Sequence, residues 1–403
     1  MRGLFGGLRD AVEGKATALL NLPDFLTWPS AKSGQSVTYA TALQVSTVMA
    51  IVRVLSEGGA QVPWKLYRSG PNGRIDEARD HPAFNLLYLR PNTWQTAFEF
   101  REQRLMHLVL TGNAFAYKSF IRGRIKELIP LEPGQVSVKQ NADKTLAYEV
   151  LGGDGSKAIP AALIWHSRGP SWNGWMGLDA VRYAREAIGL GMALEESHAR
   201  LHKNGTQVSG TYSVEGALNE QQHASLTKWI KQNTTGENAG APLVLDRGAK
   251  WLTQQMSGVD AQHVETRKLQ IEEMCRAFRV FPQMVGHSDK TATFASAEAF
   301  FSAHVMHSLA PWAQRNDQSA TVNLLTEEEQ KTLYFKHALR GLMRGALKDQ
   351  AEYYAKALGS GGSPAWLTQD EVRGYEELNP MGGAAGQLRE PSNVGDPASL
   401  PAA

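Results

Sequence analysis

The segment 260–301 constrains the fold most, because a long helix, a sharp stop and a polar loop follow one another there. From 260 to 281, apolar residues recur at helical spacing, which predicts an amphipathic helix with one apolar stripe. The stripe consists of Ile271, Met274, Cys275 and Phe278. Pro282 biases Phe281 away from helical geometry, so the helix is expected to end there.

The residues after this stop, 282–295, are small and polar and contain one lysine, Lys290. Another helix is expected from Ser296. A stiff helix that holds a mobile polar loop suits contact with a moving or variable partner. It does not suggest a catalytic pocket.

Composition limits the class of protein. The 403 residues are 42% hydrophobic and 20% charged, which predicts two or more domains. The only cysteine, Cys275, lies on the apolar stripe, so a disulfide framework is excluded and a reducing compartment fits. No stretch of about 18 apolar residues occurs, so no membrane span is expected. A net charge of +2 is far from the strong basic bias of a protein that grips nucleic acid widely.

Periodicity before residue 178 predicts an α+β module. A helix is expected at 39–57, a strand at 62–68 and two helices within 81–112. Turn residues then separate short strands that should form an antiparallel meander, at 113–121, 124–130, 135–140 and 145–151.

A second long helix is predicted at 178–203, ended by Asn204-Gly205. Small residues keep it slim and favour close packing with a neighbouring helix, notably Ala184, Ala187 and Gly191. The insert 204–259 is expected to hold a strand near 208–214, a helix at 219–232 and a hairpin of 242–245 with 250–253.

The C-terminal part is predicted to be mainly helical. A helix from Ser296 should stop near Pro311 and be followed by a strand at 332–339. Two helices are then expected, at 343–358 and 368–378. Segment 1–36 lacks a sustained period, and 381–403 is rich in Gly, Ala, Pro and Ser, which predicts disorder.

The sequence contains no complete motif for catalysis, cofactor binding or metal binding among those considered. No phosphate-binding Gly-rich loop with Gly-Lys-Ser/Thr occurs, and Gly169–Asn173 lacks the second glycine of a nucleophile elbow. His198 and His202 share a helix face without the metalloprotease glutamate, and His304 and His307 are expected on a helix surface or at an interface. We therefore expect no enzyme, no cofactor and no metal site.

Three tryptophans cluster around a tight turn: Trp165, Trp172 and Trp175. Such residues could stack on bases, but near a turn they favour packing or interface roles. A hydrolase hidden in the α+β module and a monomeric nucleic-acid-binding module remain as alternatives. The first requires a clustered acid–base or metal constellation, and the second requires a strong basic bias.

Blocks spread over residues 40–380 carry a family resemblance through their order and spacing. They are His81–Leu87, Arg90–Asn92, Leu110–Tyr117, Ile164–Ser167, Lys203–Gly205, Asp260–Glu265, Phe278–Gly286, Ser296–Glu298 and Glu371–Arg373. In this order they resemble the portal proteins of tailed bacteriophages and related prophages.

The resemblance implies the portal fold, which is α+β and forms a ring, usually a dodecamer, at one capsid vertex. Double-stranded DNA passes through its centre during packaging and ejection. The parts it implies are a flexible segment 1–36, a wing (37–177 and 296–342), stem helices 178–203 and 260–281, a clip 204–259, a tunnel loop 282–295, crown helices 343–380 and a disordered tail 381–403.

The resemblance also implies partners: the terminase large subunit and the head-tail adaptor at the clip, the major capsid protein, and other copies of the chain. The location would be the virion, with assembly in the host cytoplasm. The expected channel residues are Ser288, Lys290, Thr291 and Thr293. The expected clip contacts are Lys228, Lys231, Arg247 and Lys250, and the expected subunit packing in the stem uses Ala184, Ala187 and Gly191.

The near-neutral charge agrees with this role. Affinity for DNA rises with the number of phosphates that a protein neutralises, and a conduit that bound many of them would stall translocation. One lysine on a loop in each subunit gives weak, sequence-independent contacts. The portal of a gene-transfer particle or of a defective prophage would be physically the same machine.

Overall fold

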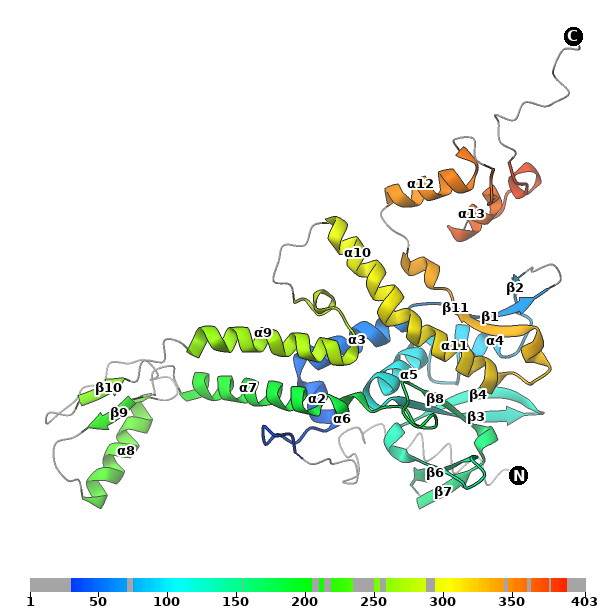
Figure 1. Ribbon diagram of the computed structural model, residues 1–403. Helices are drawn as coiled ribbons and strands as arrows, with labels where there is room; N and C mark the ends of the chain where they lie inside the picture. Colours follow the sequence, from blue (N-terminus) through cyan, green and yellow to red (C-terminus); the bar gives the residue numbers. More distant parts are fainter. Residues whose placement is uncertain are drawn as a thin grey trace, which may run out of the picture. The chain divides into compact units, whose positions relative to one another are not determined.

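The computed structural model divides at Ala338 and Leu339 into two compact units. Figure 1 shows the elements of both. The structure describes residues 30–70, 75–153, 155–204, 210–213, 219–234, 250–253, 259–287, 294–343, 347–360, 364–376 and 378–389.

The first unit begins with two helices where the sequence predicted one. Thr38 caps α2 (Tyr39–Gln44) by accepting a hydrogen bond from the backbone N–H of Thr41 at 3.1 Å. Val45 is extended, with φ −72° and ψ 115°, and α3 (Ser46–Ala60) starts after it. The residues predicted as one helix therefore change direction at Val45.

A three-stranded sheet brings together strands from near the start and near the end of this unit. β1 (Trp64–Ser69) pairs with β2 (Ile75–Glu77) on one side and with β11 (Leu333–His337) on the other, both antiparallel. Because β11 lies far along the chain, the strand predicted at 332–339 completes a sheet begun near residue 64.

The predicted meander is in fact two sheets. One has the order β4-β3-β8, from β3 (Asn113–Ile121), β4 (Arg124–Leu131) and β8 (Ile164–Arg168). The other has the order β5-β6-β7, from β5 (Val136–Gln140), β6 (Leu146–Gly152) and β7 (Gly155–Ile159). The 3₁₀ turn η4 (Pro133–Gln135) carries the chain between them. The hairpins β3–β4 and β5–β6 are correct, but β5 does not pair with β4 as a meander requires. Instead β8 pairs with the other edge of β3.

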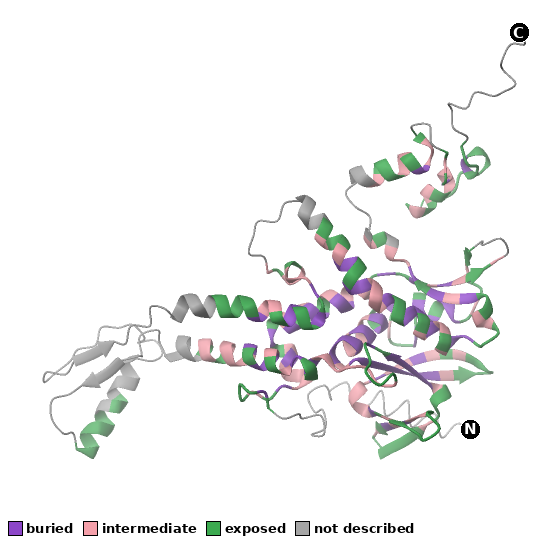
Figure 2. Ribbon diagram, in the orientation of Figure 1, coloured by how far each residue is buried: buried purple, intermediate pink, exposed green. Residues whose placement is uncertain are grey.

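Helices α4 (Phe84–Tyr88) and α5 (Ala97–Thr111) confirm the two helical patterns expected within 81–112. Buried residues gather where α3, α5, β3 and β8 meet (Figure 2). The rings of Trp64 and Trp165 lie 5.9 Å apart in this core, and the guanidinium of Arg104 lies 3.6 Å above the Trp165 ring. Trp165 is thus a packing residue, as expected.

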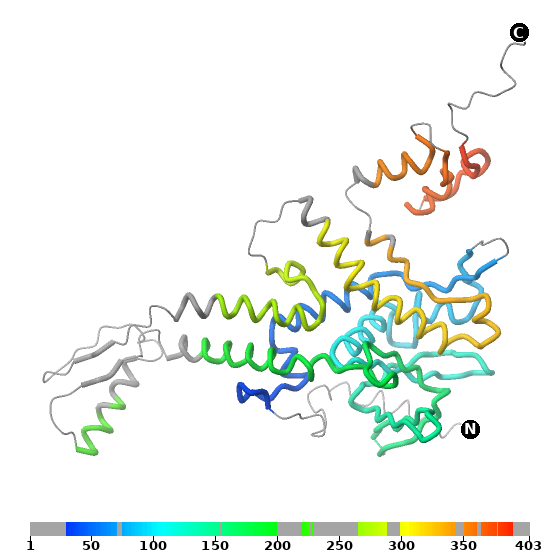
Figure 3. Tube along the Cα trace, viewed as in Figure 1, coloured from blue at the N-terminus to red at the C-terminus, as the bar shows by residue number. Residues whose placement is uncertain are grey.

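The second long helix is interrupted near its start. α6 (Ala180–Tyr183) and α7 (Arg185–Asn204) are separated by Ala184, whose ψ of 6° is not helical. α7 ends at Asn204, as predicted. α9 (Val259–Phe278) runs antiparallel beside α7 (Figures 1 and 3).

The described part of the insert contains β9 (Gly210–Ser213), α8 (Glu220–Thr234) and β10 (Lys250–Thr253). β10 pairs antiparallel with β9, which lies much earlier in the chain than the hairpin partner predicted at 242–245. Segment 242–245 lies outside the described residues.

The predicted helix stop at Pro311 is wrong. α10 (Phe294–His304) leads into the π-helical turn η8 (Val305–Leu309) and then into α11 (Ala310–Leu324). Pro311 lies in the first turn of α11. A proline has no N–H to donate, and the first turn of a helix requires none, so the π turn allows the helical path to pass the proline.

The second unit contains η10 (Leu339–Met343), α12 (Leu347–Ala357) and α13 (Gln369–Tyr375), which confirms a helix within each of the two predicted ranges. The tail predicted as disordered from 381 overlaps η12 (Gly383–Gly386). The Asp370 carboxylate holds this region by accepting the N–H groups of Met381 and Gly382 at 2.7 and 2.9 Å. Among the described helices, none is both long and apolar enough to cross a membrane.

Candidate functional site

The C-terminal end of α9 fixes how the chain leaves the helix. Arg279 has a positive φ of 58° and donates its N–H to the Arg276 carbonyl at 3.2 Å. The N–H of Val280 donates to the Cys275 carbonyl at 2.9 Å. These two bonds form a Schellman motif, with an arginine in the position that usually holds glycine. The helix thus ends three residues before the predicted stop at Phe281, because Arg279 adopts the left-handed conformation.

The chain then makes a second tight turn. η7 (Pro282–Val285) ends at Gly286, whose φ is 79°, and the N–H of His287 donates to the Pro282 carbonyl at 3.0 Å. Ser308 Oγ donates to the Arg279 carbonyl at 2.7 Å, which ties this turn to η8. The four expected channel residues, Ser288, Lys290, Thr291 and Thr293, follow directly but lie outside the described residues.

Direct contacts hold α7 and α9 together. Gln270 Nε2 donates to the Ala187 carbonyl at 2.5 Å, and Arg267 pairs with Glu195 at 3.8 Å. A Cβ added at Gly191 would overlap the terminal methyl of Met274. Met274, Cys275 and Phe278 are buried, which confirms the apolar stripe.

The three residues expected to pack against another subunit lie close to the chain's own helices. Ala184 is buried, Ala187 bonds to Gln270, and Gly191 faces Met274. The slim face of α7 therefore accommodates α9 of the same chain. Packing of these residues against another subunit stays a prediction.

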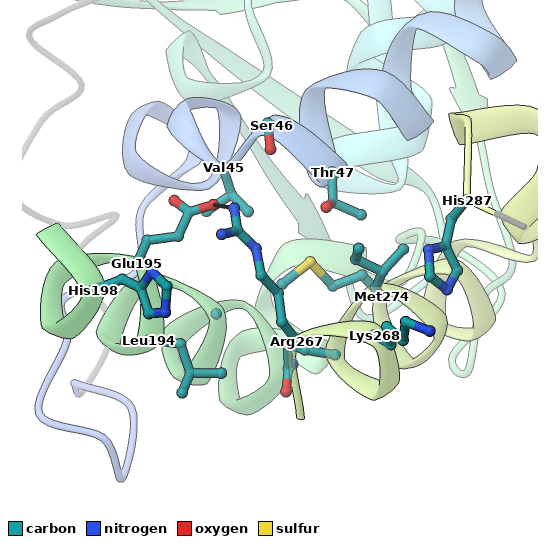
Figure 4. A pocket seen from close by; sticks show the side chains of 13 residues that line it. Val45, Ser46, Thr47, Leu194, Glu195, His198, Arg267, Lys268, Met274 and His287 are labelled. Carbon is teal, nitrogen blue, oxygen red and sulfur yellow. Dashed lines mark ion pairs between the residues drawn. The ribbon is translucent and has the colours of Figure 1, made fainter. Parts of the chain in front are cut away.

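A cavity of about 300 Å³ opens between the α7–α9 pair and the start of α3 (Figure 4). We call it the helix pocket. Val45, Ser46, Thr47, Leu194 and Met274 form walls, and the charged or titratable side chains around them include Glu195, His198, Arg267, Lys268 and His287. His287 Nε2 is buried and has no hydrogen-bond partner among the described residues.

Burial changes the chemistry of two titratable residues that the sequence singled out, Cys275 and His304. Burial raises the pKa of the Cys275 thiol to about 11, with a smaller contribution from Glu272, so the thiolate nucleophile is disfavoured. His304 is buried, contrary to the helix-surface prediction, and burial lowers its pKa. In the described part of the chain, no cluster of three or more His, Cys, Asp or Glu side chains could hold a metal ion.

The turn after β8 presents Trp172 to solvent. Asn173 Oδ1 accepts the N–H groups of Trp175 and Met176 at 3.0 and 2.9 Å, and Ser171 Oγ accepts that of Gly174 at 2.9 Å. The Ser171 hydroxyl thus stabilises the turn. Trp172 is 92% exposed, which keeps the expected interface role open for it.

The expected clip contacts are only partly visible. Lys228 is exposed on α8. Lys231 belongs to the same helix, and Lys250 begins β10 opposite Ser213. Arg247 lies outside the described residues.

Sequence reasoning missed three exposed apolar residues on this helical layer: Tyr183, Leu190 and Leu269. A signal was available for two of them. Leu190 and Leu269 fall off the apolar stripes of their helices, where polar residues are expected.

The sequence model of the phage portal protein family matches residues 46–377. The chain is 29% identical to the "Probable portal protein" of Streptomyces phage phiC31, over 91% of this chain and 82% of that protein. It is 27% identical to the portal protein of Enterobacteria phage HK97, over 89% of this chain and 84% of that one.

Solved structures share the fold. A chain of the virion of a native gene transfer agent particle aligns with a TM-score of 0.58 at 22% identity, covering 85% of this chain and 92% of that chain. The HK97-family phage portal protein from Corynebacterium diphtheriae aligns with a TM-score of 0.58 at 16% identity, covering 78% of this chain and 98% of that one. Because the family match spans both units, the chain belongs to the phage portal protein family.

Proposed function

We propose that copies of this portal protein form a closed ring, a dodecamer, at one capsid vertex, and that double-stranded DNA is packaged and ejected through its centre. The observation that carries this proposal is the family match, which runs from the start of α3 to beyond α13 and so includes the whole α7–α9 pair. A C12-symmetric neck of a native gene transfer agent particle, whose chain aligns with a TM-score of 0.58, supports the ring.

In this proposal α7 and α9 form the stem, and segment 282–295 is the tunnel loop. The Schellman motif and Gly286 direct the chain into that loop from a fixed helix end. Lys290 would then meet phosphates together with the hydroxyls of Ser288, Thr291 and Thr293. Such contacts would be weak and independent of base sequence, because few phosphates are neutralised in each subunit.

The insert 204–259 would be the clip that binds the terminase large subunit and the head-tail adaptor. The exposed Lys228 on α8 supports a role in charge-based docking. Residues 37–177 and 296–342 would form the wing, in contact with the major capsid protein, and residues 343–380 the crown. The ring would assemble in the host cytoplasm and remain in the virion.

Mass measurement and negative-stain imaging of the purified protein test the ring. A particle with the mass of twelve subunits and a central hole is the expected result. A compact monomer at micromolar concentration would refute the proposal and would return the nucleic-acid-binding module to consideration.

A second candidate is the portal of a gene-transfer particle. The likeness to the neck of an empty gene transfer agent particle, with a TM-score of 0.60 at 22% identity, favours it. The ring would be the same, and only the DNA cargo would differ. Sequencing the DNA inside particles that contain this protein separates the two, because a phage carries its own genome and a gene-transfer particle carries host fragments.

A further inference from the structure

Three large apolar side chains lie exposed in this region: Leu190 on α7, Leu269 on α9, and Tyr183 on α6, the short helix just before α7. Tyr183 is 72% exposed, Leu190 43% and Leu269 54%. We call them the stem ridge. Exposed apolar side chains that gather on one surface mark interaction sites in soluble proteins.

The stem ridge and the helix pocket lie on opposite faces of the α7–α9 layer. An α-helix turns about 100° per residue, so Leu190 points about 100° away from Gly191, which contacts α9. On α9, the direction of Leu269 is rotated about 140° around the helix axis from that of Met274. The direction of Ile271 is rotated about 60° from Met274 in the opposite direction. Because the helices are antiparallel, Leu190 and Leu269 project from one face, and Ile271 and the α3 side of the helix pocket occupy the other. Leu194, one turn after Leu190, marks the edge of the pocket nearest the stem ridge.

The charges beside the two surfaces are complementary. Glu265 is exposed on α9 one turn before Leu269, whereas Glu186 on α7 pairs with Arg185 and adds no excess charge. Arg276 contacts both Glu272 and Glu273, which leaves one excess carboxylate there. At the rim of the helix pocket Arg267 pairs with Glu195, and Lys268 leaves the rim with a net positive charge beside His198 and His287.

We propose that the stem ridge of one subunit inserts into the helix pocket of the next subunit in the ring. The proposal rests on the proposed function, since it requires a ring. A cyclic ring is closed by a head-to-tail contact, in which two different surfaces of one subunit meet the matching surfaces of its two neighbours. Opposite faces of one helical layer, one with protruding apolar side chains and one with a cavity, provide such a pair.

Cysteine cross-linking tests the contact. In a Cys275→Ala background, which removes the only native thiol, Leu190→Cys and Ser46→Cys subunits are co-expressed and oxidised. Ser46 is exposed at the pocket rim. We expect a disulfide-linked dimer that joins the two variant chains, and a ladder of larger species when one chain carries both substitutions.

The matched control pairs Leu190→Cys with Lys139→Cys, an exposed site on β5 away from the stem. Cross-linking to Lys139→Cys that equals cross-linking to Ser46→Cys would overturn the proposal. So would intact rings, seen by negative stain, that give no Leu190–Ser46 dimer, and that result would leave the proposed function standing. Failure of the unsubstituted protein to form rings would instead contradict the proposed function itself.

A charge comparison probes the same contact without a covalent bond. Leu190→Lys and Leu190→Glu remove the same apolar side chain from an exposed position, so both chains should fold. Because the pocket rim is basic, we expect the lysine variant to need about tenfold more protein than the glutamate variant for half-maximal ring assembly. Equal assembly of the two variants, measured by analytical ultracentrifugation, would contradict the assigned contact.

Discussion

Arg279 is the residue whose backbone conformation directs the chain out of α9 and toward segment 282–295. A left-handed conformation costs a residue with a Cβ roughly 1–2 kcal/mol, and glycine avoids this cost. Glycine also loses more backbone entropy on folding, which offsets part of the stabilisation. We expect Arg279→Gly to stabilise the helix end by about 0.5–1 kcal/mol. The readout is a two- to fivefold slower hydrogen exchange, roughly, at the Val280 amide, which closes the Schellman motif.

Arg276→Gly is the matched control, because it makes the same substitution one turn earlier at an ordinary helical position. There glycine costs about 1 kcal/mol, so exchange at Val280 should become faster. Slower exchange in both variants would show that loss of the arginine side chain, and not the backbone conformation, is responsible.

His166 is held neutral in the core. Asn113 Oδ1 already accepts the N–H of Gly177, so it accepts His166 Nε2–H at 3.1 Å, and the Tyr148 hydroxyl donates to Nδ1 at 3.2 Å. Burial, with smaller contributions from the positive charges of Arg168 and Arg104, lowers the pKa of His166 to about 3. Below about pH 6.5 His166 is therefore protonated in the unfolded chain but stays neutral in the folded protein.

This difference predicts acid sensitivity. Stability from His166 is complete above pH 6.5 and is lost as the pH falls toward 3, by about 2 kcal/mol at pH 5. His166→Gln should flatten the decline in unfolding free energy between pH 7 and 5, measured by urea denaturation, even if it lowers stability overall. His307→Gln, at an exposed histidine, should leave the decline unchanged. Parallel pH curves for the His166 variant and the native chain would sink this assignment.

At the scale of elements, the close approach of α7 and α9 depends on Gly191. A leucine there must displace the Met274 side chain, and such overpacking costs about 1–3 kcal/mol. We expect Gly191→Leu to lower the melting temperature and Met274→Ala to restore part of the loss. A double-mutant cycle should give a favourable coupling of roughly 1 kcal/mol, and additive effects would contradict the contact.

Gly153→Leu serves as the control, because no atom lies within 4 Å of a Cβ added at Gly153. It should change stability little. The contact between Gly191 and Met274 also affects what an assembly assay on a Gly191 variant would measure. A Gly191→Leu protein that failed to assemble would report first on the chain's own stem, so the exposed Leu190 is the better probe of the subunit contact.

At the scale of the whole molecule, the proposed channel role implies that the sparse charge of segment 282–295 would govern DNA movement. Lys290→Glu reverses one charge in every subunit, so a full ring would place a circle of carboxylates around the phosphates. We expect normal rings, seen by negative stain, and a DNA packaging rate at least tenfold lower in a packaging assay with the terminase motor. Normal packaging by this variant would remove Lys290 from the proposed channel wall.

Lys290→Arg is its matched control, because the charge is kept while the shape of the donor changes. Packaging should stay close to the native rate. If this variant also packaged slowly, the shape or mobility of the loop, and not its charge, would limit translocation.

Local patterns predicted the type of most described helices and strands, but not the strands β2, β7 and β8. The apolar stripe of α9, the strands β3 to β6 and the capped helix α5 follow from side-chain periodicity and turn residues within short windows. The errors arise where a contact with a distant segment, or the conformation of a single residue, determines how an element ends or pairs. Arg279 ends α9 earlier than predicted, and the π turn η8 lets the helix continue past Pro311. β8 pairs with β3 although the strands β5 to β7 separate them in the sequence.

The sequence by itself determined the α+β class, the long helices and the family, because each is written in local spacing or in the order of blocks along the chain. Only the tertiary structure decided which residues meet. It turned Gly191 toward Met274, enclosed the helix pocket beside α3 and left Leu190 and Leu269 uncovered. Which face of a helix is covered depends on the segments packed against it from elsewhere in the chain, and a linear pattern does not contain that information.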